Sequence, residues 1–115
     1  MKRLHLFNII SVETLGFCNR ACWFCKFGQD REDRPPVRMR WETIERIVLN
    51  LEDLQYRGRL SWFCINEPLL DKRMTEILRF SRSRLPYAPL TLNTNGDLLT
   101  EDRYFELRAA GLDEY

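Results

Sequence analysis

Three of the four cysteines of this chain lie close together near its start. Cys18, Cys22 and Cys25 form a C-x3-C-x2-C pattern. Three thiolates at this spacing on one loop can each bind one iron of a [4Fe-4S] cube, which leaves the fourth iron without a protein ligand. An iron in that state is open to an incoming molecule. The spacing therefore predicts a reactive iron–sulfur site on the three cysteines.

A structural metal site is the alternative interpretation of the same residues. Clustered cysteines in a protein without a secretion signal indicate metal binding more than disulfides. Zinc binds four thiolates in a closed tetrahedron, and Cys64 would then be the fourth ligand. Cys64 lies in the apolar stretch LSWFCI, where a small core residue is expected instead. A non-catalytic α/β module stabilised by zinc or iron stays open at this point.

The composition of the 115 residues excludes several other classes. A chain that is 44% hydrophobic and 30% charged is neither a disordered tail nor a membrane span. A formal net charge of +1 gives no field that would attract nucleic acid or an anionic membrane, so a small-molecule or peptide partner is expected. The N-terminus lacks a signal-peptide pattern, which predicts a cytoplasmic protein. No catalytic triad is present, and the solitary His5 is expected at the surface.

Short apolar segments predict strands that lead into polar loops. Ile9, Ile10 and Val12 predict a strand within residues 8–13, directly before the cysteines. Leu60–Ile65 is almost continuously apolar, as in a parallel strand covered on both faces. Leu90–Asn93 predicts a third strand before the turn residues 94–97, and Leu112–Tyr115 the opening of a fourth.

Helical patterns separate these strands, and polar residues mark their ends. The first helix is expected to follow an exposed loop at residues 29–38 and to end before Gly58. Asp71 is predicted to cap the second helix, and Thr100 and Gly111 to begin and end the third. The predicted inward residues of the first two helices are Ile44, Ile47, Val48, Leu51, Leu54, Met74, Ile77 and Leu78, while Arg79, Arg82 and Arg84 are expected in solvent.

The order of strand and helix predicts an α/β fold of parallel βαβ units. A complete (β/α)8 barrel needs roughly 250 residues, so residues 1–115 are expected to form one unit that is either about half a barrel or a small open α/β sheet of three to four strands. Reactive groups in such folds gather at the carboxyl ends of the strands, where the cysteine loop begins.

Several segments resemble the radical S-adenosylmethionine (radical SAM) family in the order in which that family has them. The cysteine spacing with Phe24 before the third cysteine is the most specific of them. Asn66-Glu67-Pro68-Leu69 resembles the family's Gly-Gly-Glu region, and Asn93-Thr94-Asn95-Gly96 resembles its common TNG segment. Weaker similarities are Met39, Trp41 and residues 110–113. The resemblance covers the chain from about Asn8 onward, and it implies the first half of a partial (β/α)6-type TIM barrel.

The resemblance also implies cofactors and a reaction. Cys18, Cys22 and Cys25 would bind a [4Fe-4S] cluster whose open iron is chelated by S-adenosyl-L-methionine. An electron from a reductant such as flavodoxin or ferredoxin would then cleave the cofactor and give a 5′-deoxyadenosyl radical that abstracts hydrogen from substrate. Phe24 would help to seat the adenine, and the backbone of Asn66, Glu67 and Pro68 would hold the methionine end.

Other features leave the resemblance open in detail. The family often has Gly where this chain has Asn66, and Asn is the residue that best tolerates left-handed backbone in its place. Glu67 equally fits the N-terminus of a helix, and Asn93 and Asn95 are expected to form turns only. The segments at residues 66–71 and 92–99 resemble most the SPASM/twitch branch. Isomerase or epimerase, oxidoreductase and transferase activities all stay possible, and the isolated unit is expected to turn over little substrate because a half barrel does not enclose it.

Overall fold

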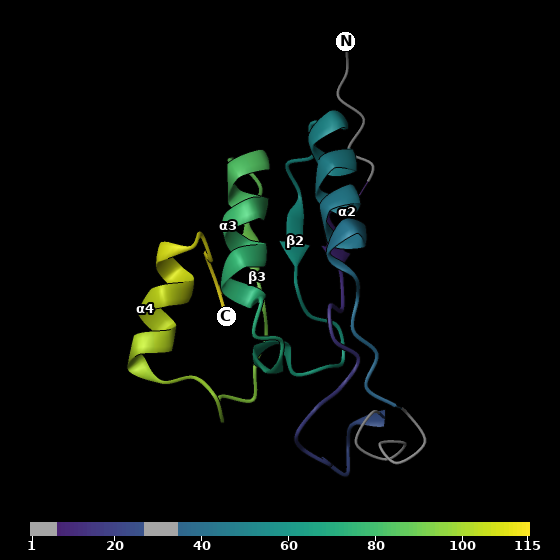
Figure 1. Ribbon diagram of the computed structural model, residues 1–115, viewed down its shortest axis with the longest axis vertical. Coiled ribbons are helices and arrows are strands. Elements are labelled where there is room, and N and C mark those ends of the chain that lie inside the picture. Colours follow the sequence, from purple (N-terminus) through teal and green to yellow (C-terminus); the bar gives the residue numbers. More distant parts are fainter. Residues whose placement is uncertain (1–6, 27–34) are drawn as a thin grey trace.

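The computed structural model describes residues 7–26 and 35–115, and it has the predicted alternation of strands and helices (Figure 1). His5 and residues 29–34 of the predicted loop lie outside the described residues. The α/β class is confirmed. In chain order the elements are β1 (Ile9–Ser11), α2 (Trp41–Asp53), β2 (Arg59–Ser61), the 3-10 helix η2 (Pro68–Leu70), α3 (Met74–Arg84), β3 (Leu90–Thr91) and α4 (Glu101–Ala109).

The three strands form one parallel sheet in the order β1-β2-β3. Ile10 pairs with Leu60, and Leu60 pairs with Leu90 on its other side. Glu114 forms a parallel bridge with Thr91, so the predicted fourth strand begins beside β3. Sequential parallel strands that are joined through helices are the βαβ units that the sequence predicted.

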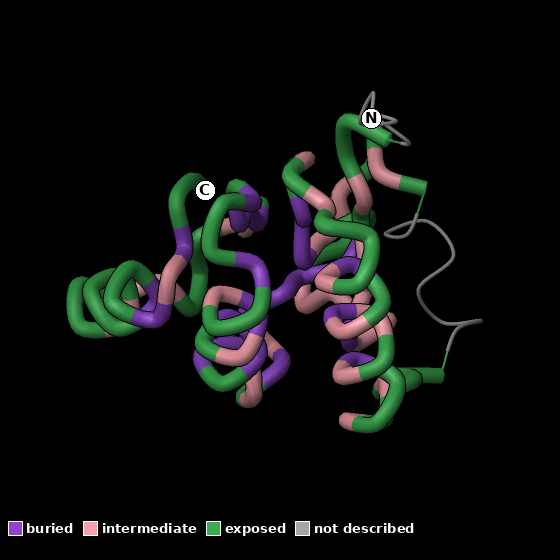
Figure 2. Tube along the Cα trace, turned by 90° about the horizontal axis from the view of Figure 1, so that it is seen from above, coloured by how far each residue is buried: buried purple, intermediate pink, exposed green. Residues whose placement is uncertain are grey.

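The helices α2, α3 and α4 lie in a row on one face of this sheet (Figures 1 and 2). Leu60, Trp62, Leu90 and Leu92 point into the layer between sheet and helices and are fully buried. Their burial beneath the helices contributes about 1.5–3 kcal/mol per large side chain. The helical side of this core is built from Ile44, Val48, Leu51, Met74, Ile77, Leu78 and Leu107.

The second strand is shorter than predicted. Trp62 is the last residue to bond to β3, through its N–H to the Thr91 carbonyl at 2.9 Å, and the chain bends after it. Cys64 is exposed and Ile65 is 39% exposed, so the prediction that Cys64 is a core residue was wrong. The backbone is turned outward because polar side chains bind it: Glu13 accepts from the Ile65 N–H at 2.7 Å, and Asn66 from the Cys64 N–H at 3.3 Å.

The ends of the helices follow the predictions only in part. Thr100 caps α4 by accepting from the Arg103 N–H at 3.2 Å, and Gly111 follows the helix with a φ of +116°. The first helix stops earlier than predicted, at Asp53, so that Leu54 is 58% exposed. Gln55, with a φ of 51°, turns the chain there, and Gly58 is needed instead for close packing, because a Cβ would overlap the Tyr56 ring.

Arg82 is half-buried and not free in solvent as predicted. Its guanidinium donates to the Gly111 carbonyl at 2.7 Å and to Asp113 Oδ2 at 2.5 Å. The same Asp113 oxygen accepts from the Leu90 N–H at 2.8 Å. Arg82 therefore connects α3 to the segment that enters the fourth strand.

Asp71 lies before α3 but does not cap it as predicted, since Arg73 is the N-cap residue. Its fully buried carboxylate accepts two hydrogen bonds from the Arg73 guanidinium, at 2.8 and 2.9 Å, and one from the Arg73 N–H. Arg73 in turn donates to the Met39 carbonyl at 2.8 Å, next to α2. Burial would raise the pKa of Asp71, but the hydrogen bonds from Arg73 outweigh it and hold the pKa below its ordinary value.

Replacing Asp71 by Asn is expected to lower the free energy of unfolding by about 2–4 kcal/mol at pH 7, because the half-buried Arg73 loses its counter-charge. A carboxyl with a lowered folded-state pKa stabilises the fold above its unfolded pKa of about 3.9, and this contribution disappears as the pH falls through the folded pKa. Urea unfolding at pH 7 and pH 3 measures both effects. The difference between wild type and Asp71→Asn should shrink at pH 3, and the exposed Asp53→Asn should change little at either pH; equal differences at both pH values would contradict the ion pair.

Candidate metal and cofactor site

The cysteines lie in a loop that is closed at its base. After β1 the chain leaves the sheet, and it returns antiparallel to itself through a bridge between Leu15 and Arg38. Gly16 N–H donates to the Val37 carbonyl and Met39 N–H to the Thr14 carbonyl, both at 2.8 Å. These bonds between residues 14–16 and 37–39 close the base of the cysteine loop, which is called its neck below. The loop projects from this neck beyond the carboxyl end of β1, at the lower end of the sheet in Figure 1.

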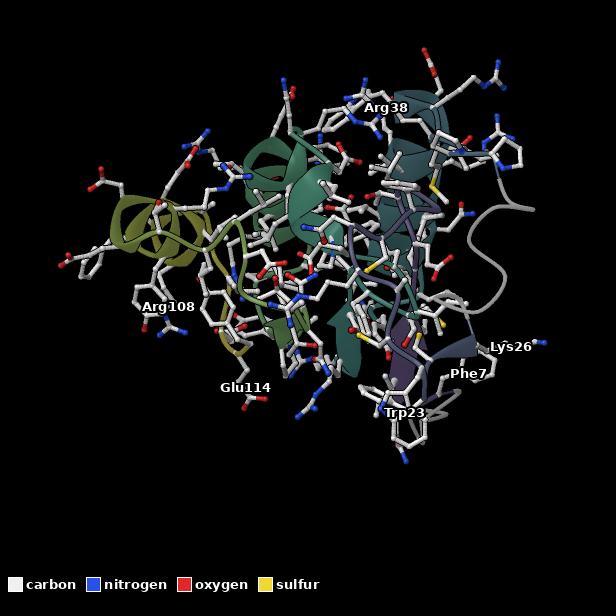
Figure 3. All side chains as sticks on the ribbon, turned by 90° about the horizontal axis from the view of Figure 1, so that it is seen from below. Phe7, Trp23, Lys26, Arg38, Arg108 and Glu114 are labelled. Carbon is white, nitrogen blue, oxygen red and sulfur yellow. The ribbon has the colours of Figure 1, made fainter. Side chains whose placement is uncertain are left out.

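The three thiols of this loop are free and half-buried. The Cys25 N–H donates to the Cys22 carbonyl at 3.0 Å, which closes a tight turn between the second and third cysteines. Next to this turn, Trp23 and Phe24 are 83% and 73% exposed and meet edge to face, with ring centroids 5.7 Å apart. Figure 3 shows Trp23 and Glu114 on the side of the sheet that faces away from the helices.

A second contact joins the cysteine loop to the loop after β3. Arg20 donates through Nε to Asp97 Oδ2 at 2.8 Å and through Nη2 to Asp97 Oδ1. Asn19 donates to Asp97 Oδ2 at 3.3 Å and accepts from Asn95 Nδ2 at 2.8 Å. Two residues between the first and second cysteines therefore bind the TNGD turn, 77 and 78 positions away in sequence.

Electrostatics reinforce this contact. Asp97 raises the pKa of Arg20 further above its ordinary value, and Cys22 and Cys18 contribute in the same direction. Arg20, and then Asn19, lower the pKa of Asp97. Both partners are therefore charged at neutral pH, and the cation is the partner that lies on the cysteine loop.

Glu67, in the segment between β2 and η2, is 1% exposed and joins three loops. Its N–H donates to the Phe17 carbonyl, directly before the first cysteine, at 2.9 Å. Its carboxylate accepts from the Thr94 hydroxyl at 2.7 Å and from the Asn95 N–H at 2.8 Å. It also accepts from the Leu69 N–H at 3.0 Å and so caps η2, which agrees with the prediction of a helix N-terminus.

The neighbours of Glu67 are equally buried. Asn66 is 3% exposed, and its φ is not positive, so the left-handed turn that the sequence suggested is absent at this described residue. Its oxygen holds the Cys64 N–H, whereas its Nδ2 has no hydrogen-bond partner among the described residues. Pro68 is buried at the first position of η2, where a missing N–H costs nothing.

The fourth cysteine lies apart from this loop, since Cys64 is exposed in the segment after β2. Within residues 7–26 and 35–115, no group of three or more Cys, His, Asp or Glu side chains is placed to hold a metal ion. An iron–sulfur cube binds each of three thiolates to a different iron. Free, half-buried thiols on a loop with a fixed neck suit that group, and the unpartnered amide of the buried Asn66 suits a polar ligand beside it.

Sequence patterns predicted site roles for the cysteines, Phe24 and the Asn66-Glu67-Pro68 segment. The fold places all of these residues at the carboxyl edge of the sheet. The Arg20 to Asp97 contact was not predicted, because turn chemistry alone explained Asp97. A charged residue between two clustered cysteines was the available signal, but only the fold identifies its partner. Asn95 forms part of a turn, as predicted, since its Oδ1 accepts from the Asp97 N–H at 3.0 Å.

Replacing Glu67 by Gln is expected to destabilise the fold by about 1–3 kcal/mol, because an amide offers one acceptor oxygen to groups that bind both carboxylate oxygens. Urea unfolding measures the loss, and hydrogen exchange at the Asn95 N–H measures the loosening of the TNG turn. The exposed Glu101→Gln is the matched control and should change neither value. Unchanged protection of Asn95 in Glu67→Gln would show that the carboxylate does not hold the turn.

Together these features define a class of protein: a parallel α/β fold that carries a thiol loop for a metal cluster at the carboxyl edge of its sheet. The radical SAM superfamily matches residues 12–115, and the chain belongs to this family. Membership implies a [4Fe-4S] cluster and S-adenosyl-L-methionine as cofactors, and it confirms the predicted relation to a TIM-type barrel.

Individual relatives are longer than this chain. The chain is 31% identical to an S-adenosyl-L-methionine-dependent 2-deoxy-scyllo-inosamine dehydrogenase of Niallia circulans, over 96% of this chain and 44% of that protein. It is 33% identical to a GTP 3',8-cyclase of Synechococcus sp. (strain WH7803), over 93% of this chain and 32% of that protein. The chain thus spans less than half the length of either relative.

Solved structures agree with the fold. The crystal structure of BtrN in complex with AdoMet and 2-DOIA superposes with a TM-score of 0.86 at 32% identity, over 93% of this chain and 43% of that one. BtrN in an open conformation gives a TM-score of 0.84 over 93% and 47%. Among the described residues, no helix has the length and apolar character needed to cross a membrane.

Proposed function

We propose that this chain supplies the cluster-binding and part of the SAM-binding apparatus of a radical SAM enzyme. The observation that carries the proposal is the loop with three free, half-buried thiols, closed at its neck and bonded to the two neighbouring loops. When bound, the two cofactors supply reductive cleavage of S-adenosyl-L-methionine and abstraction of hydrogen from substrate.

In this proposal the residues of the chain have separate roles. Cys18, Cys22 and Cys25 hold the cluster, and the exposed Phe24 ring stacks on the adenine. The backbone from Asn66 to Pro68 holds the methionine end of the cofactor, while Glu67 fixes that backbone to the loops beside it. A flavodoxin or ferredoxin is the proposed reductant, and a cytoplasmic location stays a prediction.

The proposed reaction class is oxidation of a small molecule. The dehydrogenase relative aligns with 96% of this chain, and the BtrN complex superposes with the TM-score of 0.86. The dehydrogenase and the GTP 3',8-cyclase both carry names of enzymes that act on small molecules, which supports a small-molecule substrate here. The non-catalytic alternative has less support, because the radical SAM family model matches residues 12–115 and the similar dehydrogenase depends on S-adenosyl-L-methionine.

Anaerobic reconstitution with iron and sulfide should give a broad visible absorbance shoulder and about four irons per chain. Cys18→Ala, Cys22→Ala and Cys25→Ala should each lose most of this iron, because each removes a cluster ligand. Cys64→Ala is the matched control and should load like wild type. Stoichiometric zinc without iron uptake, or release of the metal in Cys64→Ala, would favour the structural metal site instead.

Replacing Phe24 by Ala is expected to weaken binding of S-adenosyl-L-methionine to the reconstituted chain about tenfold, because stacking of a base on an aromatic ring contributes about 1–3 kcal/mol. Isothermal titration calorimetry measures the dissociation constant. Phe105→Ala removes a similarly exposed ring from α4 and serves as the control. Equal affinities for Phe24→Ala and wild type would remove Phe24 from the adenine site.

A further inference from the structure

Arg20 is a cation at a fixed place within the proposed cluster loop. It lies between the first and second cysteines, and its guanidinium forms two parallel hydrogen bonds with Asp97, at 2.8 Å through Nε and a second one through Nη2. A bidentate bond fixes both the position and the plane of a guanidinium. Asn19 also donates to this carboxylate, at the Oδ2 that accepts from Arg20 Nε.

The two partners of this ion pair belong to different loops. Arg20 lies on the cysteine loop, two positions from both Cys18 and Cys22. Asp97 belongs to the turn after β3, which Glu67 holds through Thr94 and Asn95. The cation is therefore fixed on the segment that joins two of the proposed cluster ligands.

We propose that Arg20, held in place by Asp97, is a positioning residue that raises the reduction potential of the iron–sulfur cluster. This inference rests on the proposed function, since it requires the cluster on Cys18, Cys22 and Cys25. Reduction adds one electron, taken from the proposed flavodoxin or ferredoxin, and thus one negative charge. A nearby fixed cation stabilises the more negative state, and local charge is one of the terms that set cluster potentials.

The contact also has an ordinary structural explanation, because it joins two loops. The two explanations predict different results when the partners are changed one at a time. A structural contact is lost equally when either partner is neutralised. An electrostatic effect has opposite signs: removal of the cation stabilises the oxidised cluster, whereas removal of the anion leaves the cation unopposed and stabilises the reduced cluster.

The test is a redox titration of the reconstituted chain, followed by electron paramagnetic resonance in the absence of S-adenosyl-L-methionine. The midpoint potential should move to more negative values in Arg20→Gln and to more positive values in Asp97→Asn. Arg20→Lys keeps the charge without the bidentate geometry, and its potential should lie closer to wild type than to Arg20→Gln. Arg46→Gln removes an exposed arginine from α2 and should leave the potential unchanged.

Several results would overturn the proposal. A shift of the same sign in Arg20→Gln and Asp97→Asn, or no shift in either while the cluster is intact, would leave the pair with a structural role only. Loss of iron from both variants, while the wild-type chain loads normally, would show that the ion pair acts in the folding of the loop and not on the potential. Failure of the wild-type chain to assemble any cluster would instead overturn the proposed function itself, and the absorbance spectrum distinguishes that result before any titration.

Discussion

The buried carboxylate of Glu67 is the interaction on which the functional end of this molecule depends. A carboxylate at 1% exposure is tolerated only where donors surround it, because an unmatched buried charge costs several kcal/mol. Here the donors come from η2 and from the turn after β3, and the backbone of the same residue binds the segment before Cys18. The segment after β2 and the turn after β3 must therefore take one joint conformation for this charge to be satisfied, and the backbone bond joins the segment before Cys18 to them.

Two kinds of constraint thus divide the fold. The apolar layer between the sheet and α2, α3 and α4 sets the direction of the strands, and it needs only hydrophobic side chains of suitable size. At the carboxyl edge the loops are positioned by directional bonds, from Arg20 to Asp97 and from Thr94 and Asn95 to Glu67. Packing sets the points at which the loops leave the sheet, and hydrogen bonds set the positions of the loop side chains. A cofactor site needs side chains that are positioned this accurately.

The sequence predicted most of the apolar layer, and it predicted part of the hydrogen bonding at the carboxyl edge. Helical periodicity located α2 and α3, and Thr100 and Gly111 marked α4 correctly, since these signals are local. The outward bend at Cys64 could not be predicted, because it arises from Glu13, a residue 52 positions away from the N–H it binds. Arg20 and Asp97 were missed for the same reason. Local patterns report which residues are apolar or turn-forming, whereas partners far apart in sequence meet only in the folded chain.

The closed neck of the cysteine loop has a consequence for variation among relatives. Residues 15 and 38 are paired, so the positions of β1 and α2 do not depend on the number of residues between them. Each doubling of the length of a loop costs only about 0.6 kcal/mol of closure entropy. Insertions and deletions between Cys25 and Arg38 should therefore be tolerated far better than between Cys18 and Cys25. Proteins with this neck can differ in that part of the loop while the rest of the barrel stays the same.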